Sequence, residues 1–270
     1  HYMGTLDETV SYFLILDALN FGSGFKSALA REGAVFEGGS IYLTVSTRLK
    51  QHFERNKAMS AVQLTQMRPQ DIFTLLELNP EGPYSQRFAG MCACSLQTLG
   101  QAVLDEAQGN FQRYVEDMSP SAGDMVRRLI KMPGFNDIHA YREQSVPFYK
   151  RAQHNVKVLS IIFNRFGETL FDDVDQITMF ADNGVAHVLH VDGLLEYDPE
   201  LDRKIKTGTY IPAGSEEEIE IRGCEGHVVE LLAAEKKMKS SDIDFILWHR
   251  SVEDERYKAS HSHRTLTWFY

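Results

Sequence analysis

The stretch VPFYKRAQHNVKVLSIIFNRF, residues 146–166, decides the fold class of this chain. Its apolar residues recur in steps of three and four, a spacing that lines one face of an α-helix. The stripe consists of Phe148, Ala152, Val156, Leu159, Ile162 and Phe166. Pro147 suits the first turn of a helix, where its missing N–H is no loss. The spacing therefore predicts a long amphipathic helix that begins near Pro147.

Helical spacing continues on both sides of this stretch. Thr5 and Glu8 have the spacing of a capping box, in which each side chain satisfies a free backbone N–H. Ser215 and Glu218 repeat that spacing. Further helices are expected at about 47–56, 69–78, 96–117, 122–131, 172–182, 185–193 and 241–256.

One short segment favours extended structure. Residues 40–46 are rich in β-branched and aromatic side chains, which are typical of strands. No internal repeat or linker divides the chain. We therefore expect a mainly α protein with a single globular domain over residues 1–270, and a missing N-terminal segment before His1.

Composition limits the classes of function. The chain carries a formal net charge of −10, whereas surfaces that bind nucleic acids are normally basic, so we expect neither DNA nor intact tRNA as a partner. A small anionic ligand stays compatible, because two or three cations in one pocket can bind it. No apolar run approaches the roughly 20 residues of a membrane span. Three cysteines without a CxxC pair favour a reduced, cytoplasmic protein.

Common cofactor and catalytic motifs are missing from the sequence. It contains no Walker loop and no GxGxxG, HExxH or GxSxG run. His261 and His263 stand two residues apart without a further pair of ligands, which is typical of a surface segment. We expect no cofactor and no metal.

Lys150 is the first residue that packing alone does not require. It follows the stripe residue Phe148 by two positions, about 200° around a helix, so it points away from the main core face. The ordinary interpretation is a solvated lysine. The alternative is a cation in the first turns of a helix, facing a cleft.

Asp182 ends an apolar stretch just before the turn dipeptide Asn183-Gly184. A carboxylate near a helix C-terminus opposes the helix dipole, so local helix stability does not explain it there. The ordinary interpretation is an N-cap for the helix expected from Val185. The alternative is a carboxylate in apolar surroundings, where its charge best stabilises a cation that develops on a sugar.

Asp244 precedes the apolar run Phe245 to Trp248, so we expect it to be partly buried. A buried aspartate needs hydrogen-bond donors, which either the protein or a ligand can supply. An aminomethyl cation or the N–H groups of a base would satisfy it.

Several strings along the chain carry a resemblance. The most specific are FYKRAQ at 148–153 and ITMFAD at 177–182. Others are DALNF (17–21), EIEIRGC (218–224), DFILW (244–248), and His263-Arg264 ahead of the terminal Phe269-Tyr270. In these strings and in their order the sequence resembles the queuosine salvage proteins, the queuosine 5′-phosphate N-glycosylase/hydrolase family.

The resemblance implies a helical fold related to the helix-hairpin-helix DNA glycosylases, with a pocket for one nucleotide. It implies hydrolysis of queuosine 5′-monophosphate, or of queuosine, which releases queuine for tRNA modification. Lys150 and Asp182 match the family's catalytic lysine and aspartate, while Asp244 and Phe245 match residues that hold the deazaguanine base. Further substrate-binding candidates from the resemblance are Phe21, Phe180, Arg222, His249 and His1, the last matching a His-Tyr pair of bacterial members.

These residue types suit the reaction that the resemblance implies. Cleavage of an N-glycosidic bond passes through an oxocarbenium-like centre at C1′, which a carboxylate stabilises electrostatically or attacks covalently. Asp182 would take one of these roles. Lys150 would orient Asp182, hold the phosphate, or do both.

Four positions depart from the family pattern. Asn183, Gly184 and Ala186 stand where the family commonly has Tyr-Arg-X-Pro, and His249 stands where many members have Asp. The change at His249 bears on the contact to the cationic amine of the queuine side chain. Two other functions stay open: a glycosylase or nucleosidase for another modified nucleoside, and a queuine-binding protein without turnover.

Overall fold

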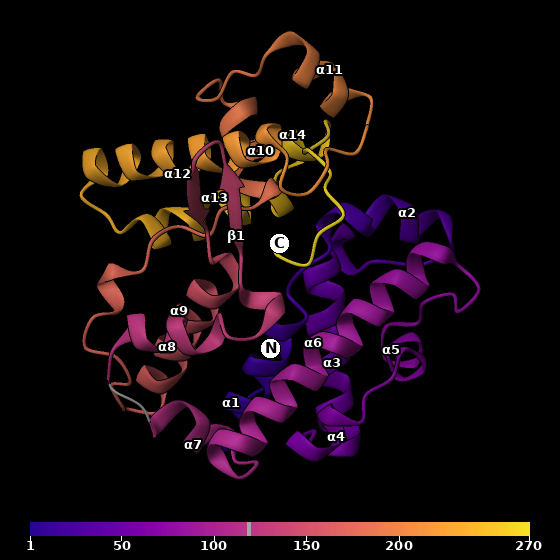
Figure 1. Cartoon of the computed structure of the whole chain (residues 1–270), viewed down its shortest axis with the longest axis vertical. Helices are drawn as coiled ribbons and strands as arrows, with labels where there is room; N and C mark the ends of the chain where they lie inside the picture. Colours follow the sequence, from indigo (N-terminus) through magenta and orange to yellow (C-terminus); the bar gives the residue numbers. More distant parts are fainter. Residues whose placement is uncertain (118–119) are drawn as a thin grey trace.

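The computed structural model describes residues 1–117 and 120–270, and most of them lie in helices (Figure 1). The first half contains α1 (Leu6–Ala18), α2 (Lys26–Arg31), α3 (Ile41–Asn56), α4 (Ala61–Thr65), α5 (Pro69–Leu76), α6 (Pro83–Ala107), α7 (Phe111–Glu116) and α8 (Ala122–Leu129). An antiparallel hairpin of β1 (Ile138–Tyr141) and β2 (Gln144–Pro147) follows. The second half contains α9 (Lys150–Arg165), α10 (Asn183–Val191), α11 (Pro199–Lys206), α12 (Glu216–Lys236), α13 (Ser240–Glu253) and α14 (Glu255–Lys258). The mainly α fold class is confirmed, while the relation to helix-hairpin-helix glycosylases stays a prediction.

Helix α9 buries the four central residues of the apolar stripe, Ala152, Val156, Leu159 and Ile162, and it packs on α1 and α8. Phe148 precedes the helix and is half-buried, and Phe166 follows it and is exposed. The helix begins later than the sequence predicts, however. Pro147 is paired with Ile138 at the end of β2, a place where the missing N–H is tolerated. Tyr149 then takes a left-handed backbone conformation with φ 50°, and the helix starts at Lys150.

The expectation of extended structure at residues 40–46 is wrong, because these residues begin α3. Ser40 is the N-cap, and its hydroxyl oxygen accepts the Leu43 N–H. Ile41 and Val45 are four residues apart, so both side chains face the core from one side of the helix. Their burial outweighs the local preference of β-branched residues for strands. Among the described residues, the sheet is the β1–β2 hairpin.

The expected helix over 172–182 is also wrong. Within that range only Val174–Gln176 forms a short 3-10 turn, and residues 177–182 lead without a helix to α10. The helix expected at 185–193 begins at Asn183 instead. Residues 96–117 are divided between α6 and α7, because Gly109 lies between them with a φ of 86°.

Two buried apolar clusters organise the molecule. The larger cluster draws on α1, α3, α6, α8 and α9, and the smaller one on α10, α12 and α13 (Figure 1). The C-terminal segment returns to the first helices. Gly22 donates its N–H to the Tyr270 carbonyl at 2.8 Å, and Arg151 donates to the Trp268 carbonyl at 2.7 Å. In the described part of the chain, no helix combines the length and the apolar character needed to cross a membrane.

A buried ion pair connects the two clusters. Arg222 on α12 donates to both carboxylate oxygens of Asp137, just ahead of β1, at 3.0 and 2.6 Å. The two side chains are 0% and 1% exposed. Burial alone would raise the pKa of Asp137, but the charge of Arg222 holds it below its usual value. Because both charges are desolvated, each is tolerable only beside the other.

Replacing Asp137 by Ala should therefore destabilise the protein by about 3–5 kcal/mol, because it removes the closer carboxylate partner of the buried Arg222 and leaves the longer, 3.3 Å pair with Glu218. Urea unfolding measures the change. Lys50→Ala is the matched control, since the Lys50–Glu54 pair is exposed and should matter by less than about 1 kcal/mol. Equal stability of the two variants would contradict this role of the buried pair.

Candidate active site

Two neighbouring cavities lie where the two apolar clusters meet. The aromatic cavity, about 410 Å³, is lined by residues that include Phe13, Phe180 and Phe245. The basic cavity, about 490 Å³, is lined by residues that include Lys26, Lys258 and Arg264. Both cavities are lined by Asn20, Tyr42, Lys150, Asp182 and Trp248. They therefore form one continuous cleft with Lys150 and Asp182 at its junction.

Asp182 is the N-cap of α10. Its Oδ1 accepts the backbone N–H groups of Gly184 at 2.7 Å and Val185 at 3.1 Å. Asp182 thus lies at the N-terminus of a helix, and not at the C-terminus of the helix expected over 172–182. The positive end of the α10 dipole therefore favours its negative charge. Its Oδ2 lies 3.7 Å from Lys150 Nζ, and the residue is only 7% exposed. Asp182 is therefore both the N-cap of α10 and a residue of the cleft.

Lys150 is not a solvated lysine, because it is only 6% exposed. It opens α9 directly after the left-handed Tyr149, and its backbone N–H donates to Asp137 Oδ2 at 3.4 Å. The late start of α9 thus fixes where the ammonium points. It meets Asp182 at the wall that the two cavities share.

Two further carboxyl groups lie close to Asp182. Asp244 on α13 is 4% exposed, and its Oδ2 accepts the Phe180 N–H at 2.9 Å. Glu225 on α12 is fully buried, and its Oε1 accepts the Asp182 N–H at 3.2 Å. Within the described residues, Glu225 Oε2 has no hydrogen-bond partner.

Burial, and next the negative charge of Asp182, raise the pKa of both Asp244 and Glu225 well above the usual range. The raised pKa values favour the neutral carboxylic acid form of both residues. Asp182, which is paired with Lys150 and with the end of α10, carries the negative charge of the group. Such a division of charge is typical of catalytic carboxylates.

Aromatic rings line the aromatic cavity beyond Asp182. Phe180 and Phe245 lie edge to face with their centroids 5.6 Å apart. His1 also lines this cavity, with Nδ1 hydrogen-bonded to the Ser46 hydroxyl at 2.9 Å. His249 lies at an exposed position of the lining, and its Nδ1 donates to the Phe245 carbonyl at 2.7 Å.

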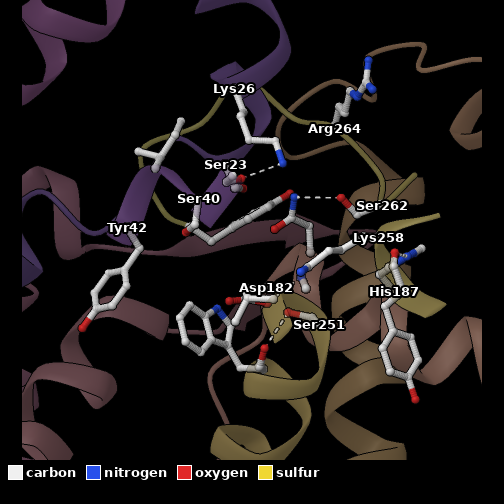
Figure 2. Close-up of a pocket in the computed structure, with 18 of the residues that line it drawn as sticks. Ser23, Lys26, Ser40, Tyr42, Asp182, His187, Ser251, Lys258, Ser262 and Arg264 are labelled. Carbon is white, nitrogen blue, oxygen red and sulfur yellow. Dashed lines mark hydrogen bonds between the residues drawn. The ribbon is translucent and has the colours of Figure 1, made fainter. Parts of the chain in front are cut away.

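Of the cations that line the basic cavity, Lys258 pairs with Glu255 at 2.8 Å, whereas Lys26 and Arg264 differ from it. Figure 2 shows Lys26 and Arg264 across this cavity from Asp182. In the described part of the chain, neither forms an ion pair with a carboxylate, and Lys26 Nζ donates to the Gly39 carbonyl at 2.9 Å. Phe21 lines the same cavity and is 3% exposed.

Of the four positions that differ from the family pattern, three line this cleft and one does not. Asn183 and Gly184 line the basic cavity, and His249 lines the aromatic one. Ala186 is fully buried in the smaller apolar cluster.

Arg222, expected to bind substrate, is not among the described residues that line either cavity. It is fully buried, where it donates to Asp137, to Glu218 and to the Ala181 carbonyl. Its guanidinium also lies 4.0 Å from the ring centroid of Phe148. It therefore supports the backbone beside Asp182, and its expected role in substrate binding stays a prediction.

Several residues of the cleft were not predicted from the sequence as site residues. Asn20 and Trp248 lie inside the resembling strings, and Tyr42 lies in the segment expected to be extended. Glu225 could have been found, because it follows Arg222 by three residues and therefore shares its buried helix face. Among residues 1–117 and 120–270, no three His, Cys, Asp or Glu side chains form a group that could hold a metal ion.

Comparison with known proteins finds similarity to one protein family over the whole chain. A protein-family model described as "Queuosine salvage protein" matches residues 1–270. A Sphaerobacter thermophilus protein named queuosine 5′-phosphate N-glycosylase/hydrolase is 31% identical over 281 residues, which cover 100% of this chain and 84% of that protein. Proteins of the same name from Dictyostelium discoideum and Mus musculus are 29% and 27% identical. The alignments cover 97% and 99% of this chain and 78% and 83% of those proteins.

The raised pKa of Glu225 predicts a pH effect on stability. Its pKa in the folded protein lies above the ordinary value of 4.5, so the stabilisation it provides is complete below that pH. The stabilisation is lost as pH rises towards the folded-state pKa. Glu225→Gln cannot ionise, so its free energy of unfolding should improve relative to wild type by up to ~1.4 kcal/mol per pH unit above about pH 4.5.

Denaturant unfolding at several pH values measures this difference. Glu230→Gln, exposed on the same helix, is the control and should follow the wild-type slope. Parallel curves for wild type and Glu225→Gln would show that Glu225 is already ionised in the folded protein.

Proposed function

Because the chain belongs to the queuosine salvage protein family, we propose that it hydrolyses the N-glycosidic bond of queuosine 5′-phosphate and releases queuine. The products are the free base and ribose 5-phosphate. The observation that carries the proposal is the Lys150–Asp182 pair, which lies between an aromatic cavity and a basic one. A nucleotide has the same order of parts, with an aromatic base, a reacting C1′ and an anionic phosphate.

The aromatic cavity suits the deazaguanine base. Phe180 and Phe245 offer apolar ring surface to a flat heterocycle. Asp244 faces the same cavity and would accept N–H donors of the base, which would favour its ionised form on binding. His249 donates Nδ1–H to a carbonyl, so in its neutral form Nε2 is an acceptor for the cationic side arm of the substrate.

The basic cavity suits the 5′-phosphate. Desolvation, and next the positive charge of Arg264, lower the pKa of Lys26, so the two cations repel each other in the free protein. A phosphate dianion would relieve that repulsion. The Ser23 hydroxyl also lines this cavity and, in the described part of the chain, has no hydrogen-bond partner. It would add a donor to the anion.

At the junction, Asp182 would stabilise the positive charge that develops at C1′ as the bond to the base breaks. Its Oδ1 is held by backbone N–H groups, which leaves Oδ2 for the reacting centre and for the proton of the attacking water. Lys150 would orient that oxygen. The cleft is lined by residues from His1 to Tyr270, which supports a single domain over the whole chain.

Asp182→Asn should lose turnover by at least about 10²–10³-fold while it still folds and binds queuine. Asparagine caps helices as well as aspartate does, so α10 is preserved and only the charge disappears. Lys150→Met should lose less. Chromatography of queuine released from queuosine 5′-phosphate measures both.

Asp198→Asn is the matched control, because Asp198 caps α11 in the same way and lines neither cavity. It should keep the wild-type rate. If Asp182→Asn also released queuine at the wild-type rate, Asp182 would have no catalytic role. If the wild-type protein bound queuine but released none from the nucleotide, it would be a binding protein and not a hydrolase.

Lys26→Ala should raise KM for queuosine 5′-phosphate about tenfold or more, the equivalent of one charged hydrogen bond of ~1.5–3 kcal/mol. It should leave KM for the nucleoside queuosine unchanged. Lys131→Ala, an exposed lysine that lines neither cavity, is the control. Equal increases in KM for nucleoside and nucleotide would mean that the phosphate does not bind beside Lys26.

A further inference from the structure

An aspartate–histidine pair lies beside the aromatic cavity and has no part in the chemistry described so far. His154 Nδ1 is 2.8 Å from Oδ1 of Asp17, a residue of α1 that is 1% exposed. Asn155 donates to the other carboxylate oxygen at 2.9 Å, and Asn20 donates to Oδ1 at 3.2 Å. Asp17 therefore holds the imidazole in one orientation.

His154 lies one helical turn beyond Lys150 on α9, so both side chains project from the same face. Lys150 reaches Asp182 at the junction, and His154 faces the aromatic cavity about 6 Å further along the helix axis. Its ring meets Phe180 and Phe245 edge to face, with centroids 5.3 and 5.9 Å away. The imidazole thus borders the space where the base would lie.

The hydrogen bond to Asp17 determines which ring nitrogen is available. Burial would raise the pKa of Asp17, but the charge of His154 and the hydrogen bonds from His154, Asn155 and Asn20 lower it below its usual value. The ionised carboxylate accepts Nδ1–H, and within the described residues Nε2 has no hydrogen-bond partner. Protonated His154 would therefore present Nε2–H to the cavity, as catalytic histidines oriented by an aspartate do.

The base needs a proton donor when it leaves. Purine nucleosides can be cleaved after protonation at N7, but a 7-deazaguanine has carbon at that position. The negative charge that develops on the departing deazaguanine must therefore be neutralised by protonation at another ring nitrogen. A positioned proton donor in the base cavity typically contributes about 10²–10⁴-fold in rate.

We propose that His154, positioned by Asp17, is the general acid that protonates the leaving deazaguanine base. This inference rests on the proposed hydrolysis of queuosine 5′-phosphate. As the C1′–N9 bond breaks, its electron pair passes to the base, and the base takes the Nε2 proton of His154. The water that bonds to C1′ gives a proton to Asp182, and exchange with solvent restores both groups.

Other titratable groups share this space and must be separated from His154. Besides Asp17, which faces the ring from α1, the aromatic cavity is lined by His1, Tyr42, Lys150, Arg165, Asp182, Asp244 and His249. Asp244 is the main competitor, because burial raises its pKa and so favours the protonated form, which can also donate a proton. The test therefore compares variants at both positions.

The test measures kcat and KM for queuosine 5′-phosphate across pH in wild type, His154→Gln, His154→Phe and Asp244→Asn. Because the protonated form of His154 is required, wild-type kcat should fall as pH rises. Both His154 variants should lower kcat at least about 10²-fold and lose that descending limb. His154→Gln should change KM and queuine binding by only a few fold, which shows that the cavity is intact.

Each outcome bears on one claim. A His154→Gln enzyme with wild-type kcat, or a descending limb that persists in both His154 variants and disappears in Asp244→Asn, would overturn the role of His154. A wild-type kcat that stays level from about pH 5 to pH 10 would overturn it without any variant. By contrast, a wild-type protein that releases no queuine at any pH would overturn the proposed function itself.

Discussion

The buried ion pair between Asp137 and Arg222 sets the geometry on which the site depends. Asp137 accepts the Lys150 N–H at the start of α9, and Arg222 donates to the Ala181 carbonyl, one residue before Asp182. The same pair therefore fixes the backbones of both central residues, although α9 and α10, at whose starts they lie, belong to different apolar clusters. Since neither charge is tolerable alone in the interior, the two clusters are held at one spacing. The distance from Lys150 to Asp182 follows from that spacing.

Charge is distributed unevenly around this framework. Three carboxyl groups surround the junction. If all three were ionised, they would repel one another strongly, because they are buried away from water. The end of α10 and Lys150 favour the charge on Asp182, whereas burial raises the pKa of Asp244 and Glu225 and favours their neutral forms. One negative charge is thus concentrated at the point where a sugar cation would form. The cations of the basic cavity lie beyond it, so each part of a nucleotide meets groups of complementary character.

The sequence predicts those features that depend on neighbouring residues. The apolar stripe of α9 and the capping box at Thr5 are both confirmed, because a spacing of three or four residues is enough to form them. Residues 40–46 mislead for a physical reason: their β-branched side chains are buried on a helix by packing against α1. Packing between distant elements is not visible in a local pattern.

The site shows the same division. Resemblance pointed to Lys150 and Asp182, but it assigned Arg222 to the pocket, while the structure buries that residue against Asp137, 85 positions away. The pairing of His154 with Asp17 spans 137 positions, and neither residue stands out in the sequence as half of a pair. Such partners become apparent only when the fold brings them together.

The most direct test of the central claim is a crystal structure of the Asp182→Asn variant with queuosine 5′-phosphate bound. We expect the base against the rings of Phe180 and Phe245, the phosphate beside Lys26, and C1′ within about 3–4 Å of the side chain at position 182. A nucleotide bound in the opposite direction, or with C1′ far from position 182, would contradict the claim that Asp182 is the centre of the reaction.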